Sequence, residues 1–217
     1  MSLDVAELMR CLASKRPIFH SEADFQHALA WELHKLFPDS DVRLELPRDA
    51  SGESLHLDLW LAKPALGIAI ELKYKTRALS VEVSGERFCL KDQSAQDQGR
   101  YGFLKDVERV ERITANCLGA SGYAILLSND SSYWKPSKKN NAVDAAFRLH
   151  EDRSIEGTLA WASHASPGTM DSREEPIVLA SNYRAHWYDY SRVDSSSYGA
   201  FRYLAFPVGR TAESPQQ

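Results

Sequence analysis

The sequence lacks the features that define several large classes of protein. Its 217 residues include only three cysteines, Cys11, Cys89 and Cys117, which are widely spaced and form no CxxC pair. This excludes a disulfide-stapled fold and a cysteine-ligated metal cluster, and it predicts reduced thiols. No apolar run approaches the roughly 18–20 residues that a membrane span requires, and residues 1–16 contain no apolar signal-peptide core. We therefore expect a cytoplasmic protein without a membrane partner.

Several catalytic motifs are also missing. The chain has no GxxxxGK(S/T) loop and no GxGxxG, so a P-loop motor and a dinucleotide-dependent enzyme are not indicated. It has no GxSxG for a serine nucleophile, and none of its seven histidines falls in an HExxH or another zinc spacing. The chemistry must therefore come from carboxylates and cationic side chains.

The chain has no basic bias either. Lys and Arg number 26 against 30 Asp and Glu, which gives a formal net charge of −4. A role in nucleic-acid binding must therefore rest on a local basic patch. The length fits a single domain over 1–217, and we expect a core at about 20–130 with a β-rich extension over 131–210.

Hydrophobic periodicity predicts the elements of the core. Ser21 is placed to cap the first helix and Pro38 follows its end, while Pro47 is expected to end the first strand. Leu57 and Leu59 should share one strand face, with Asp58 on the other. The predicted helices span 21–37 and 94–117, and the predicted strands span 42–46, 55–61, 67–74 and 123–127. This α-β-β-β-α-β order indicates an α/β fold with a mixed sheet flanked by helices.

Weaker patterns follow the core. The charged residues of the second helix are expected to form a solvated face, and they are Asp106, Glu108, Arg109, Glu111 and Arg112. Further on, the patterns predict a short helix over 143–149 and strands over 157–161, 177–190 and 201–208, the last two pairing. The late aromatic residues are expected to fill a core, with a dimer contact as the second interpretation. Lys135, Lys138 and Lys139 read as a solvated loop, with a phosphate contact as the alternative.

Three charged residues interrupt the two central apolar strands. Asp58 lies in LHLDLWL, and Glu71 and Lys73 lie two apart in GIAIELKY, so they point the same way. Such groups are costly to bury unless they are paired or bind a metal. Two carboxylates that converge provide hard oxygen ligands for Mg²⁺, and a neighbouring ammonium can orient a water or offset charge in the transition state. The alternative is a charged strand face without a function.

The segment LHLDLWLAKPALGIAIELKYK resembles the active-site hairpin of the PD-(D/E)XK nuclease superfamily, which has the restriction-endonuclease-like fold. That family places an Asp and a Glu-x-Lys on a β-meander between two helices. Leu57 stands where the family has Pro, whereas Glu71-Leu72-Lys73 is intact. The resemblance covers about residues 20–128. It implies Asp58, Glu71 and Lys73 as catalytic residues, the two carboxylates as ligands of Mg²⁺ or of Mn²⁺ in its place, and DNA as the substrate.

The resemblance also extends to residues outside the hairpin. Family members often carry a metal-binding Glu in the first helix, which implies Glu22, with Glu32 as the competing choice. The start of the second helix implies Gln98, Arg100 and Tyr101 as weaker substrate-binding residues.

Two functions from different classes remain open at this point. The first is a Mg²⁺-dependent DNA nuclease, for which a homodimer would supply two active sites. The second is an inert protein of the same fold that binds nucleic acid or a protein partner. A partner that supplies specificity within a defence or repair assembly is a further alternative.

Overall fold

The computed structural model describes residues 3–50, 53–63, 66–137 and 141–209. Its helices are α1 (Val5–Lys15), α2 (Glu22–Leu36), α3 (Gln96–Asn116) and α4 (Pro167–Met170), with a 3₁₀ turn η1 (Ala145–Phe147). Its strands are β1 (Asp41–Ala50), β2 (Glu53–Lys63), β3 (Leu66–Lys75), β4 (Leu79–Val83), β5 (Glu86–Leu90), β6 (Ala120–Ser128), β7 (Ser154–Leu159), β8 (Ile177–Arg184), β9 (Trp187–Arg192) and β10 (Ala200–Gly209). The predicted α/β class is confirmed.

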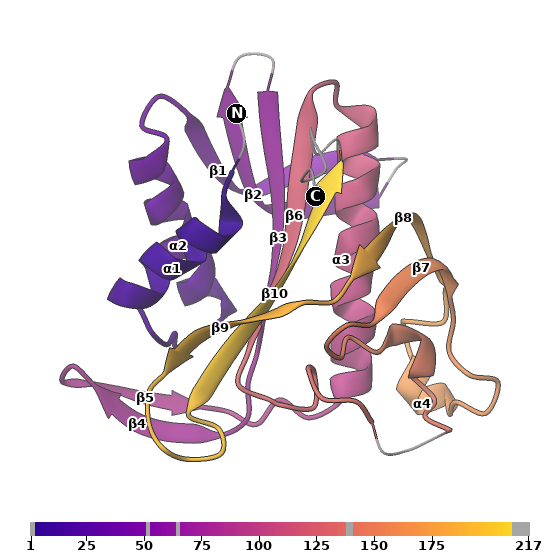
Figure 1. The fold of residues 1–217 in the computed structure, drawn as a ribbon. Coiled ribbons are helices and arrows are strands. Elements are labelled where there is room, and N and C mark those ends of the chain that lie inside the picture. Colours follow the sequence, from indigo (N-terminus) through magenta and orange to yellow (C-terminus); the bar gives the residue numbers. More distant parts are fainter. Residues whose placement is uncertain (1–2, 51–52, 64–65, 138–140, 210–217) are drawn as a thin grey trace, which may run out of the picture.

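A six-stranded mixed sheet in the order β1-β2-β3-β6-β10-β9 forms the centre of the protein (Figure 1). β3 and β6 are parallel, and every other neighbouring pair in this sheet is antiparallel. α3 is the crossover that parallel neighbours require. Two hairpins, β4-β5 and β7-β8, lie outside the central sheet. β9 pairs with β10 as predicted, and through β6 the last two strands extend the sheet.

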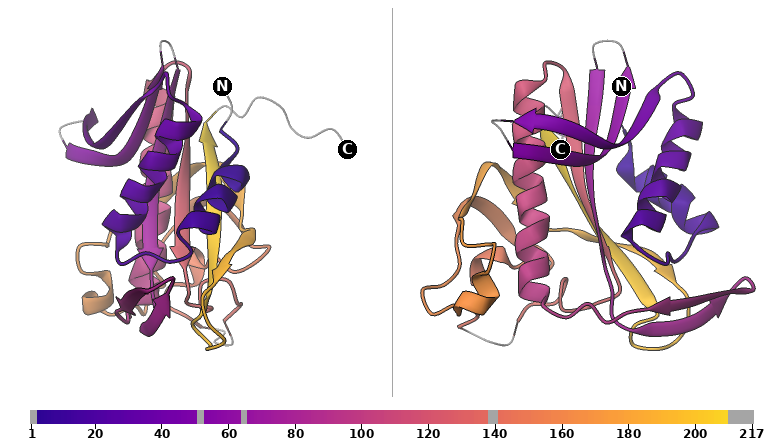
Figure 2. Two further views of the ribbon diagram at one scale, coloured as in Figure 1. Left: turned by 90° about the vertical axis from the view of Figure 1, so that its left-hand side faces the viewer. Right: turned by 180° about the vertical axis from the view of Figure 1, so that it is seen from behind.

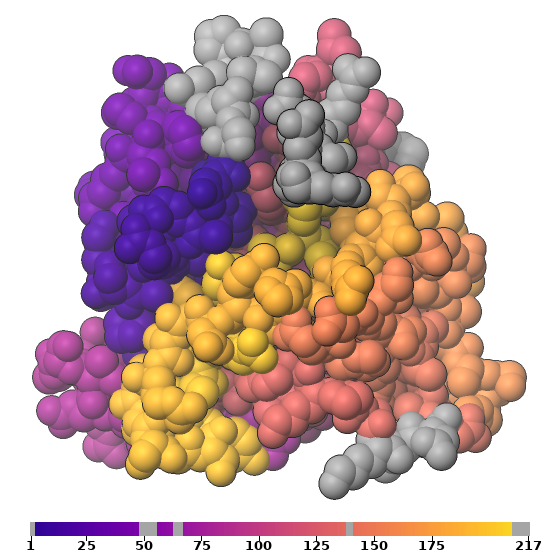
Figure 3. Space-filling model, viewed as in Figure 1, coloured from indigo at the N-terminus to yellow at the C-terminus, as the bar shows by residue number. Residues whose placement is uncertain are grey.

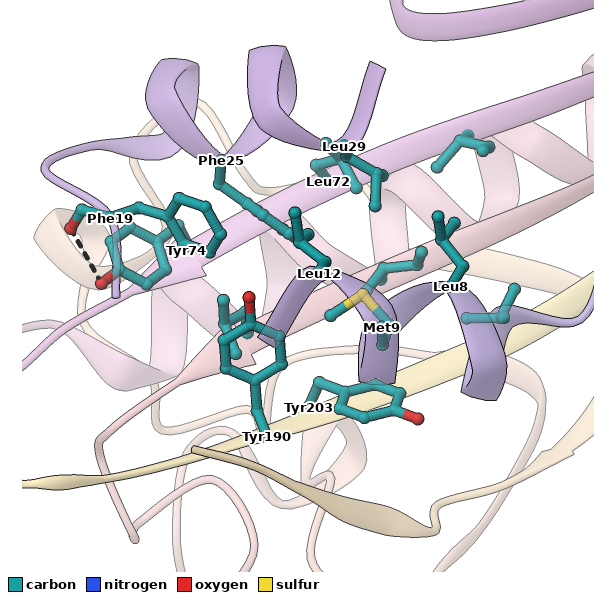
Figure 4. Packing of buried hydrophobic residues seen from close by; sticks show 14 of the residues in the cluster. Leu8, Met9, Leu12, Phe19, Phe25, Leu29, Leu72, Tyr74, Tyr190 and Tyr203 are labelled. Carbon is teal, nitrogen blue, oxygen red and sulfur yellow. Dashed lines mark hydrogen bonds between the residues drawn. The ribbon is translucent and has the colours of Figure 1, made fainter. Parts of the chain in front are cut away.

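The sheet is covered by helices on both faces. α1 and α2 pack on one face, and their apolar side chains form one core with Ile70, Leu72 and Tyr74 of β3 (Figure 4). α3 packs on the opposite face, where Phe103 and Val107 form a second core with the β7-β8 hairpin and β10 (Figure 2). β6 is buried on both of its faces, and this explains why its sequence is an almost continuous apolar run.

Most C-terminal aromatic residues fill these cores, as predicted. The buried ones are Tyr183, Trp187, Tyr190, Phe201, Tyr203 and Phe206. Only Tyr188 and Tyr198 among the described late aromatics are more than a third exposed. The C-terminal segments cover much of the face shown in Figure 3. The three cysteines are free thiols, as predicted.

Several boundaries differ from the predictions. Pro47 does not end β1, because β1 is an edge strand and one side of its backbone needs no partner strand. The predicted strand 177–190 is two strands, since β8 pairs with β7 and β9 with β10. α1 and the β4-β5 hairpin were not predicted. The signal for α1 is present, because Val5, Leu8 and Leu12 share one buried face and Asp4 caps the helix.

Two further expectations concern charge. Glu111 does not face solvent, because its carboxylate accepts hydrogen bonds from the backbone N–H groups of Ala180 and Ser181 and from the Tyr183 hydroxyl. Lys138 and Lys139 lie outside the described residues.

No helix in the described part of the chain is both long and apolar enough to cross a membrane.

Two glycines give a matched test of this packing. An added Cβ at Gly122 of β6 would lie 2.3 Å from Val110 Cγ1 and 2.8 Å from the Ala69 carbonyl oxygen, whereas at Gly102 of α3 it would meet nothing. We expect Gly122→Ala to lower the free energy of unfolding by about 1–3 kcal/mol through overpacking. Gly102→Ala should raise it by about 0.5–1 kcal/mol through helix propensity. Urea denaturation measures both, and an unchanged Gly122→Ala protein would contradict the packing of α3 on β6.

Candidate active site where two strands diverge

The candidate site lies where β2 and β3 separate. Their pairing runs from Lys63–Leu66 to Leu59–Ile70 and ends there, although both strands continue. Beyond that point, backbone N–H groups of β3 need other acceptors, because an unpaired buried donor is costly. Two carboxylates provide them.

Asp58 and Glu22 take the place of the missing strand. Asp58 Oδ2 accepts a hydrogen bond of 2.7 Å from the Leu72 N–H, and Glu22 Oε2 accepts one of 2.8 Å from the Tyr74 N–H. Glu22 belongs to the first turn of α2, which Ser21 caps through the Asp24 N–H as predicted. The two carboxylates therefore come together from different elements.

A local irregularity sets the direction of Asp58. The pairing of β1 with β2 skips Glu45 and Asp58, and Glu45 has a φ of 48°. The expected alternation is wrong here, because Leu57 packs in the α3 core while Leu59 packs in the opposite core. The Gln26 amide donates to the Asp58 carbonyl (2.8 Å) and to Glu45 Oε1 (2.7 Å), which holds the irregularity in place.

The other predicted residues meet α3. Lys73 Nζ lies 3.0 Å from Asp106 Oδ2. Arg109 Nη1 bridges Glu71 Oε1 (3.1 Å) and Asp106 Oδ1 (3.2 Å). Glu71 is only 1% exposed, whereas the side chains of Lys73 and Arg109 keep 22% and 23% of their surface accessible. The Glu71 carboxylate is therefore buried, whereas the two cations of the cluster are partly accessible to solvent.

Burial and neighbouring carboxylates raise the pKa values of Asp58 and Glu71. Burial raises the pKa of Asp58 to about 6, against the Leu72 hydrogen bond and Lys73. Burial, together with Asp106 and Asp58, raises the pKa of Glu71 to about 9. Burial would lower the pKa of Lys73, but the charges of Asp106 and Glu22 outweigh it and raise that pKa.

The cluster contains more carboxyl groups than cations. Four carboxyl groups face the two cations Lys73 and Arg109, and they belong to Glu22, Asp58, Glu71 and Asp106. Buried Glu71 Oε1 and Asp106 Oδ2 have no hydrogen-bond donor in good geometry, although both lie near a cation. A site short of positive charge and lined by hard oxygens fits a divalent cation.

In the described ranges, no three His, Cys, Asp or Glu side chains are arranged to hold a metal ion. Backbone N–H groups bind Asp58 and Glu22, and Arg109 pairs with Glu71. Mg²⁺ is usually held by one or two carboxylates, with water and phosphate oxygens completing the shell. The donor set therefore fits Mg²⁺ in its chemistry.

Of the two helix glutamates, Glu22 is the one that reaches the cluster. Glu32 is buried farther along α2, where it pairs with Lys15 of α1 and with Lys35. The competing choice of Glu32 is therefore not supported by the geometry.

The three weaker substrate-binding predictions fall on residues that join α3 to the C-terminal segments. Arg100 is 3% exposed and pairs with Asp144 (2.8 Å). The Tyr101 hydroxyl donates to the Glu175 carbonyl, and the Gln98 amide donates to the backbone carbonyl of residue 169. Their contact with DNA stays a prediction, whereas their contacts in the fold are structural.

Sequence reasoning missed Asp106 and Arg109. Asp106 was expected on a solvated face, and that expectation is wrong because it is 3% exposed and paired with two cations. A signal was available, since Asp106 lies three residues after Phe103 and four before Val110 and so falls within the apolar stripe of α3. A carboxylate in such a stripe needs a cationic partner.

Comparison of the chain with protein-family models, with curated proteins and with solved structures finds no significant match.

The hydrogen bonds of Asp58 and Glu22 predict a difference between two kinds of variant. Asp58→Ala and Glu22→Ala should each lower the free energy of unfolding by about 1–3 kcal/mol, because a β3 N–H loses its acceptor. Asp58→Asn and Glu22→Gln keep an acceptor oxygen and should lose clearly less. Urea denaturation without metal measures the free energy of unfolding of each Ala variant and of its amide counterpart. Equal stability of the Ala and amide variants would show that these carboxylates do not replace the strand.

Proposed function

We propose that this protein is a metal-dependent nuclease of the PD-(D/E)XK type, with a restriction-endonuclease-like core, that hydrolyses phosphodiester bonds in DNA. The observation that carries the proposal is the convergence of Asp58, Glu71 and Lys73 in one partly open cluster that is short of positive charge. The support from the fold is the element order α2-β1-β2-β3-α3-β6, into which the β4-β5 hairpin is inserted before α3, with β3 and β6 parallel.

Each residue has a distinct role in this proposal. Asp58 and Glu71 would hold Mg²⁺, with Glu22 completing the site, and Mn²⁺ would substitute. The ion supplies an activated water and stabilises charge on the phosphate when bound. Lys73 acts as a cation that orients the water or offsets transition-state charge, because its pairing with Asp106 favours the protonated ammonium.

Asp106 and Arg109 position these groups from α3. Asp106 holds the Lys73 ammonium, and Arg109 holds Asp106 and Glu71 together. A bound metal ion would compete with Arg109 for Glu71. We propose that the protein acts on DNA in the cytoplasm, and that a homodimer or a protein partner supplies a second site or the specificity.

One observation favours a second function, an inert nuclease-fold protein that binds nucleic acid or a protein. Arg109 and Lys73 already pair with buried carboxylates, which is the arrangement of a site that needs no metal ion. Metal binding separates the two functions.

The nuclease proposal predicts metal-dependent cleavage. The wild type should cut plasmid, linear duplex or single-stranded DNA with Mg²⁺ or Mn²⁺ and not with EDTA. Asp58→Asn, Glu71→Gln and Lys73→Met should each lower the cleavage rate by about 100-fold or more, because each removes a ligand or a catalytic cation. Lys35→Met is the matched control, since Lys35 pairs with Glu32 outside the cluster.

Calorimetric titration with Mn²⁺ completes the test. Binding by the wild type and not by Asp58→Asn supports the nuclease. Absence of both cleavage and metal binding in the wild type would sink the nuclease proposal and leave the binding protein. Full activity of the three variants would sink the assignment of the site.

A further inference from the structure

A second polar site lies at the carboxyl ends of the parallel strands β3 and β6. Its cavity of about 300 Å³ is lined in part by residues of the segments that follow these two strands. These segments run near the start of α3, at the lower edge of Figure 1. Its cationic lining residues are Arg77, Lys135 and Arg148. Ser132 and Tyr198 line it as well. We refer to it as the basic cavity. Ligands of open α/β sheets bind in this position relative to the strands.

The charge around the basic cavity is opposite to that of the whole chain. Asp130 is the one carboxylate among its described lining residues, and its oxygens already accept from Gln96 Nε2 and from the Ser132 N–H. No described carboxylate lies within ion-pair distance of the exposed Lys135.

The neighbouring arginines add to this excess. Arg100 and Arg148 share a single carboxylate, because Asp144 Oδ2 lies 2.8 Å from Arg100 and Asp144 Oδ1 lies 2.7 Å from Arg148. Arg77 pairs with Asp92 at 3.3 Å and with Asp130 at 3.9 Å. The four cations therefore have three carboxylates among them as ion-pair partners, in a protein whose formal net charge is −4. The cations are Arg77, Arg100, Lys135 and Arg148, and the carboxylates are Asp92, Asp130 and Asp144.

The cations of the basic cavity are held in advance. The Arg77 guanidinium lies 5.3 Å from the centre of the Tyr198 ring. Fully buried Asn129 fixes both residues, since its Oδ1 accepts from the Arg77 N–H (2.7 Å) and its Nδ2 donates to the Tyr198 carbonyl (2.9 Å). A cation that is fixed in advance binds an oxyanion at low entropic cost.

A line of cations joins the basic cavity to the candidate active site. Lys73, Lys75 and Arg77 occur at every second position of β3 and its exit, and Lys75 lies on the same strand face as Lys73. A nucleic-acid strand presents its phosphates at regular intervals, so a second cationic site along one strand would hold its backbone in register.

We propose that the basic cavity binds a phosphate group of the DNA backbone, away from the bond that is cut. This assignment rests on the proposed nuclease function for the identity of the polymer. Binding to the cavity needs no metal ion, so it is measured in EDTA, where catalysis plays no part.

The test is fluorescence anisotropy with labelled duplex and single-stranded DNA in EDTA. Lys135→Glu and Arg148→Gln should each weaken binding by about tenfold and make the salt dependence shallower by about one phosphate contact. Arg184→Glu is the control, because it makes the same charge reversal as Lys135→Glu on β8, where Arg184 pairs with Asp152. The control should bind within about twofold of the wild type. Thermal denaturation confirms that each variant is folded; Arg148→Gln leaves Asp144 its partner Arg100.

A second experiment uses inorganic phosphate, and it distinguishes a phosphate of the DNA backbone from a free phosphate ion as the ligand. Thermal stabilisation by phosphate, relative to chloride at equal ionic strength, should be lost in Lys135→Glu and kept in Arg184→Glu. Loss of phosphate stabilisation with unchanged DNA affinity would overturn the backbone assignment in favour of a free phosphate. If Lys135→Glu behaves like the control Arg184→Glu in both the DNA-binding and the phosphate experiment, the proposed site is wrong. If the Asp58 and Glu71 variants keep the cleavage rate of the wild type while the binding results are as expected, the proposed nuclease function is wrong and the basic cavity remains supported.

Discussion

The separation of β2 from β3 is the constraint on which the candidate site depends. Once their pairing ends at Leu59 and Ile70, the backbone of β3 has N–H groups to satisfy within a folded interior. Side-chain oxygens satisfy them, and a side chain that takes the place of a strand must lie in the plane of the sheet. Asp58 and Glu22 are brought together for this backbone reason. The same geometry that stabilises the fold therefore concentrates negative charge at one point.

That concentration explains the rest of the cluster. Burial and neighbouring carboxylates raise the pKa values of Asp58 and Glu71, and nearby cations reduce the repulsion between the carboxylates. Lys73 supplies one from within β3, and α3 supplies Arg109 across the sheet. The remaining deficit of positive charge distinguishes this cluster from a closed network of ion pairs. A divalent cation is the simplest group that would remove it.

The sequence predicted the parts of this arrangement that follow from short periods. Alternation located β2 and β3, and Asp58, Glu71 and Lys73 are visible there as charged residues in otherwise largely apolar strands. It could not predict that Leu57 and Leu59 face different cores, because the irregularity depends on Glu45 in another strand and on Gln26 in a helix. Asp106 and Arg109 were missed for a related reason, since a mixed-charge helix face reads as solvated until its packing partner is known. The order of β10 and β9 in the sheet depends on pairings between distant segments, which local patterns do not encode.

The place of β10 in the sheet has a consequence for synthesis of the protein on the ribosome. β10 lies between β6 and β9, and its Leu204, Phe206 and Val208 complete the core under α3. All the residues of the candidate active site leave the ribosome long before this strand does. Until then β6 has a free edge and α3 covers an incomplete core, which is the kind of surface that aggregates or binds chaperones. The nascent chain therefore carries every residue of the candidate site before β10 completes the core under α3.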